Sequence, residues 1–476
     1  MALTEVNSLG IKDLEVKTGD IAADAVTGAK IADDAIDSEH YVNASIDHAH
    51  LADDCVDGDN IADNSVGLAH MAHGTDGQII TYDASGAPTA VGPGTDGQVL
   101  TSTGAGSPPA FETIAASPPG NRNLIVNGAM RIAQRGAGPT AGNGHLTVDR
   151  WACVRNAVDE DPTQTQITLT SSDTGPWAKG FKKAFQVTNG NQTSGAGSDD
   201  KVEIYQNIAG ADINSSGWIY TDPNSDITLS FWVKSSVAQN FYILIRTNSG
   251  TLQSYTTDTG SLSANTWTYV QRTIPGYANN QIDDNVDSGF CIQWFPFLGT
   301  DKTGTLTTNQ WAAYSGTEQT PDSTATWYTT NDATFALTGV QLEVASAATD
   351  YEHRKTNDDL TRCQRYYWRV TGNANDMPGW SHHMWHASAS HAHFHCPVPM
   401  RKQPSVTQNC TMQIKSADTS DTWTSGMYID NAVTSHDNGS SFQGGTFRKD
   451  ISGSSIDHPG TTQITVAGNV EFPAEI

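Results

Sequence analysis

Basic residues are scarce in this chain. Lysine and arginine number 26 against 52 aspartate and glutamate in 476 residues, which gives a formal net charge of −26 and a pI near 4.7. Binding to nucleic acid requires clustered lysine and arginine that neutralise phosphates. We therefore expect no nucleic-acid partner, and any contact with an anionic cell envelope to be specific or cation-assisted.

Cysteine pairs and long apolar runs are also lacking. The six cysteines form no C-x-x-C pair and are scattered at Cys55, Cys153, Cys291, Cys363, Cys396 and Cys410. This spacing indicates reduced, mostly buried thiols of a protein assembled in a cytosol. No run of 18 apolar residues occurs, and the N-terminus has neither a basic nor an apolar leader region. We expect no signal peptide and no membrane insertion.

Sequence motifs of enzymes are missing as well. The chain has no G-x-S-x-G turn, H-E-x-x-H helix, P-loop or dinucleotide fingerprint. Residues 121–476 also show none of the regular repeats of a long parallel β-helix. We expect no enzyme and no cofactor, although a carboxylate pair that hydrolyses a polysaccharide is defined in space and stays an open alternative.

The N-terminal region contains an apolar residue at every fifth position. Neither a helix nor a strand places such a set on one face, so each repeat needs a turn or a short helical piece. Related segments such as Ile21–Val26 and Ile31–Ile36 show a ten-residue unit. The fourteen positions are Val6, Ile11, Val16, Ile21, Val26, Ile31, Ile36, Tyr41, Ile46, Leu51, Val56, Ile61, Val66 and Met71.

These apolar residues are too few to hold one chain folded against its conformational entropy. Identical copies wound round a common axis bring each apolar row against its counterparts. The alternative is a disordered acidic tail, since residues 1–73 hold fifteen acidic residues against three lysines, a net of −12. Disorder does not require a strict five-residue period, so we predict a homotrimeric shaft.

The rest of the chain divides by composition. Residues 74–120 hold a repeated Gly-Thr-Asp-Gly-Gln segment that predicts β-hairpins, followed by a Pro/Gly linker. Residues 121–354 alternate apolar and polar side chains between turn-forming residues, which predicts a jelly-roll-like β-sandwich. Residues 355–370 predict a connecting helix, with acids first and bases last. Residues 371–476 predict a smaller C-terminal β tip domain.

Particular side chains can be placed within the sandwich. Core-facing rows are expected at Val202 and Ile204, at Ile227, Leu229, Phe231 and Val233, and at Phe241, Ile243 and Ile245. In the last strand the apolar register changes near Thr338–Gly339, which predicts a β-bulge. Four tryptophans in strand-like runs are expected in the core, namely Trp151, Trp232, Trp267 and Trp294.

Several segments, in order along nearly the whole chain, resemble the tail fibres or receptor-binding proteins of tailed bacteriophages, particularly marine and cyanobacterial phages. The start of the chain and the Lys30–Ala35 repeats resemble the family's shaft. The other matching segments are Asn123–Gly128, Val148–Trp151, Ser230–Lys234, Leu337–Val344, Glu352–Arg354, Arg362–Tyr367 and Pro399–Val406.

The resemblance implies a mainly β trimeric fibre of the virion, assembled in the host cytoplasm. Its N-terminus would dock on a phage tail adaptor or nozzle protein. Its C-terminal domains would attach the virion to a host surface polysaccharide or receptor. Two alternatives stay open, a polysaccharide-degrading tailspike and a purely structural virion fibre or appendage.

The tip domain holds the residues that we predict to bind a surface glycan. Exposed aromatic faces flanked by short polar groups are typical of such sites, and Trp380 and Trp385 flank an apparent loop. The alternative is that these side chains pack the small C-terminal core. The predicted ligand-binding residues are Trp380, His383, Trp385, His386, Trp423 and Tyr428.

Two clusters contain residue types that bind metals, and each also has a simpler explanation. His391, His393 and His395 share one face of a predicted strand, and three chains can bring such imidazoles together. A solvated strand face explains the same spacing. The acidic run at residues 283–287 lacks the spacing and glycine of an EF-hand, which favours a plain turn.

Overall fold

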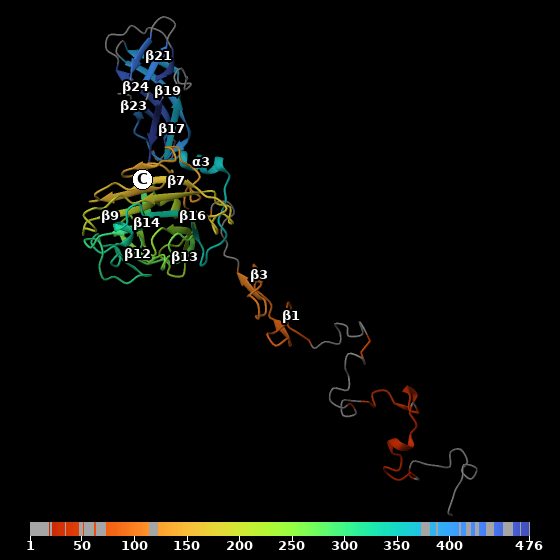
Figure 1. Ribbon diagram of the computed structural model, residues 1–476. Coiled ribbons are helices and arrows are strands. Elements are labelled where there is room, and N and C mark those ends of the chain that lie inside the picture. The colour runs from red at the N-terminus through yellow and green to blue at the C-terminus, as the bar shows by residue number, and fades with distance from the viewer. Residues whose placement is uncertain are drawn as a thin grey trace, which may run out of the picture. The chain divides into compact units, whose positions relative to one another are not determined.

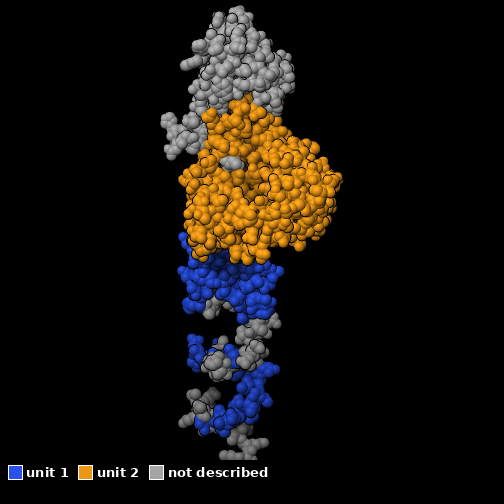
Figure 2. Space-filling model, turned by 90° about the vertical axis from the view of Figure 1, so that its left-hand side faces the viewer, with its two compact units in different colours: residues 1–114 blue, residues 115–476 orange. Residues whose placement is uncertain are grey.

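The computed structural model divides the chain into two compact units, Met1–Ile114 and Ala115–Ile476 (Figure 2). The structure describes residues 19, 21–33, 35–46, 51, 61–62, 73–113, 122–372, 381–386, 389–408, 411–415, 420–423, 428–434, 442–450, 460–466 and 468–475. Within these ranges, only the backbone is described for residues 38, 113, 372, 381–393 and 408–469. No helix among them is long and apolar enough to cross a membrane.

The N-terminal repeats fold into turns that recur every ten residues. The amide of Ala25 donates to the carbonyl of Ala22 at 3.0 Å, and Ala35 donates to Ala32 at the same distance. Short 3₁₀ helices alternate with these turns at η2 (Gly28–Lys30) and η3 (Ser38–His40). The predicted turn or short helical piece in each repeat is therefore confirmed in the described residues.

The apolar residues of the five-residue period are exposed in the single chain. Their exposed fractions range from 37% to 55%, although side chains of this kind normally avoid water. The described members are Ile21, Val26, Ile31, Ile36, Tyr41, Ile46, Leu51 and Ile61. One chain alone leaves this apolar row unburied.

Two antiparallel hairpins follow the repeats (Figure 1). Strand β1 (Ile79–Tyr82) pairs with β2 (Pro88–Val91), and β3 (Gln98–Thr101) pairs with β4 (Ala110–Thr113). Each begins with the same turn, in which the side chain of Gln78 or Gln98 accepts a hydrogen bond from the threonine amide three residues earlier. The repeated sequence therefore builds a repeated structure.

The second unit contains two antiparallel six-stranded sheets, which confirms the predicted β-sandwich (Figure 1). The first sheet has the order β13 (Thr268–Pro275), β10 (Asp226–Ser235), β16 (Thr334–Val344), β8 (Lys183–Thr188), β7 (Thr163–Thr168) and β5 (Thr140–Ala141). The second has the order β15 (Trp311–Ala313), β12 (Gln253–Asp258), β11 (Tyr242–Thr247), β14 (Ser288–Leu298), β9 (Lys201–Ala209) and β6 (Ala152–Asn156).

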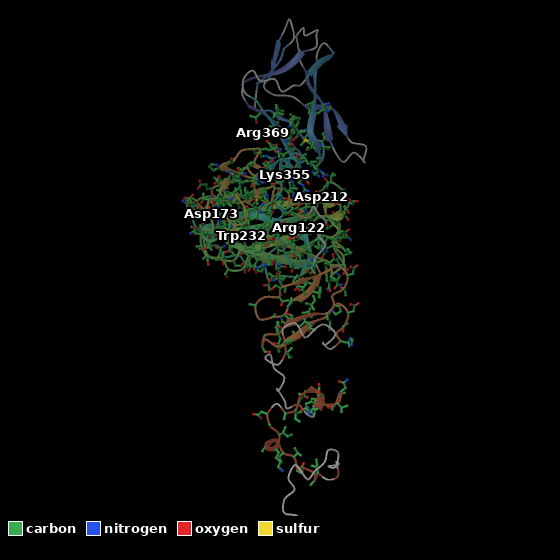
Figure 3. All side chains as sticks on the ribbon, turned by 90° about the vertical axis from the view of Figure 1, so that its right-hand side faces the viewer. Arg122, Asp173, Asp212, Trp232, Lys355 and Arg369 are labelled. Carbon is green, nitrogen blue, oxygen red and sulfur yellow. The ribbon has the colours of Figure 1, made fainter. Side chains whose placement is uncertain are left out.

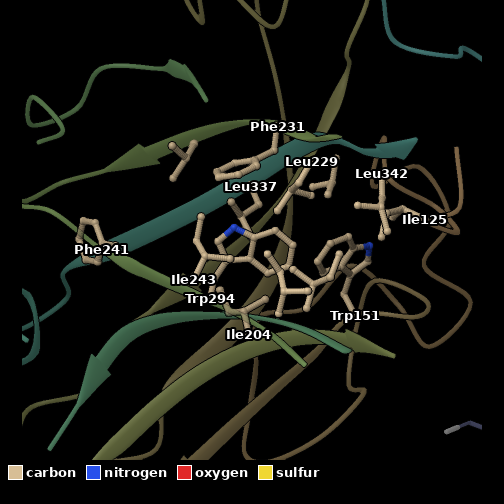
Figure 4. Packing of buried hydrophobic residues seen from close by; sticks show 14 of the residues in the cluster. Ile125, Trp151, Ile204, Leu229, Phe231, Phe241, Ile243, Trp294, Leu337 and Leu342 are labelled. Carbon is tan, nitrogen blue, oxygen red and sulfur yellow. The ribbon is translucent and has the colours of Figure 1, made fainter. Parts of the chain in front are cut away.

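Alternate side chains of both sheets fill the core between them (Figure 4). Phe231 of β10 meets Trp294 of β14 edge to face, with ring centroids 5.6 Å apart. Trp151 packs on Trp294 at 5.6 Å, and both tryptophans are fully buried as predicted. The nine residues predicted for the core-facing rows are all buried. The alternation of apolar residues therefore located the core correctly.

The predicted bulge in the last strand of the sandwich is present. Ser230 pairs with Gln341 and Trp232 pairs with Thr338, so two residues of β16 lie opposite Phe231 alone. Gly339 has a φ of +60°, and a Cβ there would lie 2.6 Å from the ring of Phe181. Glycine permits both the left-handed backbone and this close approach.

Two short helices in the sandwich were not predicted, α1 (Gly210–Asn214) and α2 (Thr326–Thr329). The acidic run at residues 283–287 forms a turn beside α1. The carbonyls of Asn285 and Asp287 accept hydrogen bonds from the amides of Ala211 and Gly210. This segment therefore satisfies the first amides of a helix.

The connecting helix is shorter than predicted. Helix α3 spans Thr356–Gln364, with acids in its first turn and Arg362 in its last, whereas the sequence predicted helix over 355–370. Strand β17 (Tyr367–Gly372) begins three residues after the helix ends. Tyr367, Trp368 and Val370 favour a strand, and pairing with β26 (Gly468–Pro473) overrides the helical pattern.

Two further antiparallel sheets contain the C-terminal strands. The smaller has the order β17, β26 and β20 (Thr407–Gln408). The larger has the order β22 (Ser420–Trp423), β21 (Thr411–Lys415), β25 (Gly460–Val466), β18 (Ser381–His386), β19 (Ala389–Met400), β24 (Phe442–Asp450) and β23 (Tyr428–Thr434). The four described cysteines are free thiols, and Cys153, Cys291 and Cys363 are buried, as predicted.

Candidate functional site

The outer face of the first sheet carries polar and aromatic side chains where its strands point away from the core. In β10 these are Thr228, Ser230, Trp232 and Lys234, which alternate with the core residues. The register places Trp232 between Tyr269 of β13 and Thr338 of β16. Ser230 lies between Gln271 and Gln341 in the next row. Side chains from three strands thus meet on the outer face of the sheet.

The prediction that Trp232 and Trp267 lie in the core is wrong. Both are only partly buried, and the ring of Trp232 packs against that of Tyr269 at 5.3 Å. The physical reason is the two-residue period of a strand, because Phe231 and Val233 point inward and Trp232 between them must point outward. This alternation was the signal that could have found Trp232 as a surface residue.

The loop between β7 and β8 forms one wall over this surface. Asp173 ties the loop to the sheet, because one of its oxygens accepts hydrogen bonds from Lys234 Nζ and Trp267 Nε1, each at 3.0 Å. Gly175 approaches the ring of Trp232 so closely that a Cβ there would lie 2.6 Å from it. The side chains of Asp173 and Trp232 are labelled in Figure 3, where the reader can follow their positions in the sandwich. The loop is therefore anchored beside the aromatic surface.

Replacing Asp173 with asparagine is expected to loosen this wall. Burial raises the pKa of Asp173, but hydrogen bonds from Trp267, Thr170 and Lys234 outweigh it and lower the pKa to about 2. Because the folded pKa lies below the ordinary 3.8, this stabilisation is present above that pH and is lost as the pH falls toward 2.

We expect Asp173→Asn to lower the unfolding free energy by about 1–2 kcal/mol at pH 7. The difference from the unaltered protein should shrink below pH 3.8 in thermal unfolding series. Asp301→Asn, at an exposed aspartate on another loop, serves as the control. A difference between Asp173→Asn and the unaltered protein that stays constant from pH 7 to pH 2 would refute the role of this carboxylate.

The segment that follows β16 forms the opposite wall. Residues 345–354 fold back over the outer face of the sheet, held by the buried side chains of Gln341 and Glu343. Glu343 accepts hydrogen bonds from the amide and hydroxyl of Thr349 at 2.8 and 2.7 Å. Gln341 accepts one from the amide of Glu352 at 2.8 Å. These contacts fix the position of the segment relative to β10 and β13.

Between the two walls lies a pocket of about 1040 Å³, which we name the sheet pocket. Tyr269 is 45% exposed, and Gln271 is exposed with no side-chain hydrogen bond to the described residues. The lining of the sheet pocket comes from the β7–β8 loop, the outer face of the sheet and the segment after β16. These residues are Ala178, Lys179, Gly180, Phe181, Ser230, Trp232, Tyr269, Gln271, Gly339, Ala348, Thr349, Asp350, Tyr351 and His353.

Polar groups from both walls meet at the rim of the sheet pocket. Lys179 Nζ lies 3.5 Å from the carboxylate of Asp350, which links the two walls. The Nε2 of His353 donates to the carbonyl of Lys179 at 2.8 Å, so its Nδ1 is an acceptor in the neutral ring. The ring of His353 packs on Phe181 with centroids 5.1 Å apart. The rim thus offers an amide, an imidazole acceptor, a carboxylate and an ammonium group.

This combination suits a ligand with an apolar face and a polar edge. The rings of Trp232 and Tyr269 provide apolar area, and the rim provides donors and acceptors. A pyranose ring has such a face of C–H groups and such an edge of hydroxyls. Among the described lining residues Asp350 is the only carboxylate, whereas glycoside hydrolysis typically uses a pair.

The structure describes the residues predicted for a glycan site in the tip only in part. Trp380 lies outside the described residues, and only the backbone is described for the others. His383, Trp385 and His386 lie in β18 (Ser381–His386), so the loop expected between Trp380 and Trp385 is a strand. Trp423 and Tyr428 lie in β22 and β23, the two opposite edge strands of the seven-stranded sheet. Glycan binding at these positions stays a prediction.

His391, His393 and His395 lie in β19, at positions paired with Arg448, Thr446 and Gly444. Side chains of this strand alternate as predicted where they are described, since Phe394 is buried and His395 is exposed. No group of three possible metal-ligating residues gathers among the residues whose side chains are described. His391 and His393 lie outside that set.

Comparisons with known proteins found low similarities. No protein-family model matches the chain, and no curated protein matches it. The enzymatically active domain of tailspike protein 4 from bacteriophage CBA120 is similar over 47% of this chain at 12% identity and a TM-score of 0.26. The match covers 21% of the tailspike chain, so this chain spans about a fifth of that protein.

Two carbohydrate-binding domains show the same level of similarity. The N-terminal cellulose-binding domain of Cellulomonas fimi β-1,4-glucanase C matches over 40% of this chain and 88% of its own, at 15% identity and a TM-score of 0.22. The family 11 carbohydrate-binding module of Clostridium thermocellum, in complex with a β-1,3-1,4-mixed-linked tetrasaccharide, matches over 43% and 98%, at 12% identity and 0.21. The sheet topology of this chain, with two six-stranded antiparallel sheets, defines the sandwich.

Proposed function

We propose that this protein binds a carbohydrate in the sheet pocket. The observation that carries the proposal is the pairing of Trp232 and Tyr269 on the outer face of the sandwich, with the free Gln271 amide and the His353 imidazole at the rim. Aromatic rings with a few convergent polar groups form typical ligand sites. The module acts by binding and carries out no reaction.

We further propose that the protein is a tail fibre of a bacteriophage virion. In this role the N-terminal repeats form the shaft and dock on a tail adaptor or nozzle protein. The domains after the shaft hold the virion on a host surface polysaccharide. Three copies per fibre and several fibres per virion raise the avidity about 10²–10⁴-fold over one site. Weak single sites are then sufficient for attachment.

The exposed apolar row of the shaft supports a homotrimer. We expect the full-length protein to have a native mass near three times 50.8 kDa by light scattering. Ile31→Asp combined with Ile36→Asp places charges in the row and should shift the mass to that of a monomer. Val42→Asp is the matched control, because Val42 is 79% exposed and lies off the five-residue period. A monodisperse monomer of the unaltered protein would refute the shaft.

A glycan array tests the proposed function. Full-length protein is applied to printed bacterial and algal polysaccharides, beside a Trp232→Ala, Tyr269→Ala variant that lacks both rings of the sheet pocket. We expect binding to at least one polysaccharide class by the unaltered protein and its loss in the variant. Equal binding by both proteins would remove the sheet pocket from the proposal, and binding by neither would remove carbohydrate recognition.

A further inference from the structure

A second pocket adjoins the sheet pocket and is lined by cations. Its volume is about 390 Å³, and it shares Gly180, Phe181 and His353 with the sheet pocket. We name it the cationic pocket. Its other lining residues are Ala129, Arg131, Lys182, Lys183 and Thr356. No acidic residue is among the described residues that line it.

The charge of this pocket stands out against the rest of the chain. The protein carries a net charge of −26, yet Arg131, Lys182 and Lys183 all line this one pocket. The ammonium groups of Lys182 and Lys183 make their described contacts with neutral groups, whereas Arg131 also interacts electrostatically with the carboxylate of Asp359. The charges of the two lysines are therefore available to an anion of the ligand.

Each cation is held in place by its neutral contacts. Arg131 donates to the carbonyl of Arg354 at 3.0 Å and to the hydroxyl of Thr356. Lys182 Nζ lies 3.1 Å above the centre of the Trp177 ring. Lys183 Nζ donates to the hydroxyl of Thr168 at 2.8 Å. The side chains are thus positioned before a ligand binds, which reduces the entropy lost on binding.

The rings of Phe181 and His353 line both pockets, with their centroids 5.1 Å apart. Gly180 also lines both pockets, and a Cβ there would lie 3.3 Å from His353, so the backbone packs closely against this ring. A saccharide on Trp232 and Tyr269 that extends past His353 reaches the cations directly. The geometry therefore couples an aromatic platform to an anion site.

We propose that the ligand is an acidic oligosaccharide, whose carboxylate, sulfate or phosphate group lies in the cationic pocket. This inference is based on the proposed carbohydrate binding in the sheet pocket and specifies its substrate class. Charge-assisted hydrogen bonds from lysine and arginine give the acidic ligand its advantage over a neutral one. The advantage falls as salt is added, because the pocket is open to solvent.

Matched pairs of polysaccharides test this inference with the full-length protein. Each acidic polymer bound on the array is compared with its carboxyl-reduced, desulfated or dephosphorylated form, which also identifies the anion. We expect the acidic form to bind at least about tenfold more tightly. Lys182→Gln with Lys183→Gln should remove this preference, whereas Lys182→Arg with Lys183→Arg should keep it.

The control is Lys302→Gln with Lys402→Gln, which removes the same charge elsewhere on the chain and should leave the preference unchanged. Equal affinity for the acidic and neutral forms would overturn the cationic pocket and leave carbohydrate binding in place. Survival of the preference for the acidic form in the Lys182→Gln, Lys183→Gln variant would also overturn the cationic pocket and leave carbohydrate binding in place. Binding of neither form would overturn both proposals.

Discussion

Replacing Glu475 with alanine is expected to lower the unfolding free energy of the sandwich by about 3–5 kcal/mol. The carboxylate of Glu475 lies 2.5 Å from Arg150 Nη1 and 3.4 Å from Arg135 Nη1. The guanidinium of Arg150 is 1% exposed and stacks on the ring of Tyr366 at 3.6 Å. Removing Glu475 leaves this cation buried without its counter-charge. An uncompensated buried charge strongly destabilises the folded protein.

The ionisation of Glu475 supports this expectation. Burial raises the pKa of Glu475, but His145, Arg150 and Arg135 outweigh it and lower the pKa to about 2. The pair is therefore fully charged at neutral pH. Chemical denaturation followed by tryptophan fluorescence measures the loss. Glu318→Ala, at an exposed glutamate, should change the unfolding free energy by less than about 0.5 kcal/mol.

A double-mutant cycle separates the ion pair from simple loss of packing. Arg150→Met with Glu475→Ala should be less destabilised than the sum of the two single variants, because the second change removes the unpaired charge. Additive effects would mean that Glu475 does not act through Arg150. A loss below about 1 kcal/mol in Glu475→Ala would contradict the buried ion pair itself.

Replacing Trp232 with alanine is expected to weaken binding of the array-selected polysaccharide at least about thirtyfold, or about 2 kcal/mol. The ring of Trp232 lines the pocket, beside Tyr269 and against Gly175. Central, partly enclosed aromatic residues typically dominate the energy of such sites. Trp232→Phe keeps a smaller platform and should give an intermediate affinity by isothermal titration calorimetry.

Tyr314→Ala provides the matched control for Trp232→Ala. Tyr314 is also partly buried, and it packs with Arg246 of β11 in the other sheet. Its loss should leave the affinity unchanged. If Trp232→Ala retains the affinity of the unaltered protein while remaining folded, the sheet pocket is not the binding site.

Much of the fold could be predicted from local sequence. The alternation of Ile227, Leu229, Phe231 and Val233 located a core strand, and the changed register at Gly339 located its bulge. The boundary of α3 could not be predicted this way. The strand pairing of Tyr367–Gly372 with residues near the C-terminus overrides the local helical pattern.

The candidate site was only partly predictable, because its walls meet through long-range contacts. The ring of His353 donates a hydrogen bond to the carbonyl of Lys179, which lies 174 residues earlier in the chain. No local pattern predicts that the β7–β8 loop and the segment after β16 enclose Trp232. Strand order is equally non-local in the C-terminal sheet, where Trp423 and Tyr428 lie at opposite edges although they are five residues apart.

Hydrogen–deuterium exchange of the full-length protein with the selected polysaccharide tests the location of the site most directly. Binding in the sheet pocket predicts slower exchange in residues 176–181, 230–232, 269–271 and 348–353. Slower exchange confined to residues 371–476 would contradict the sheet pocket. That result would instead place recognition in the tip, at the residues first predicted from the sequence.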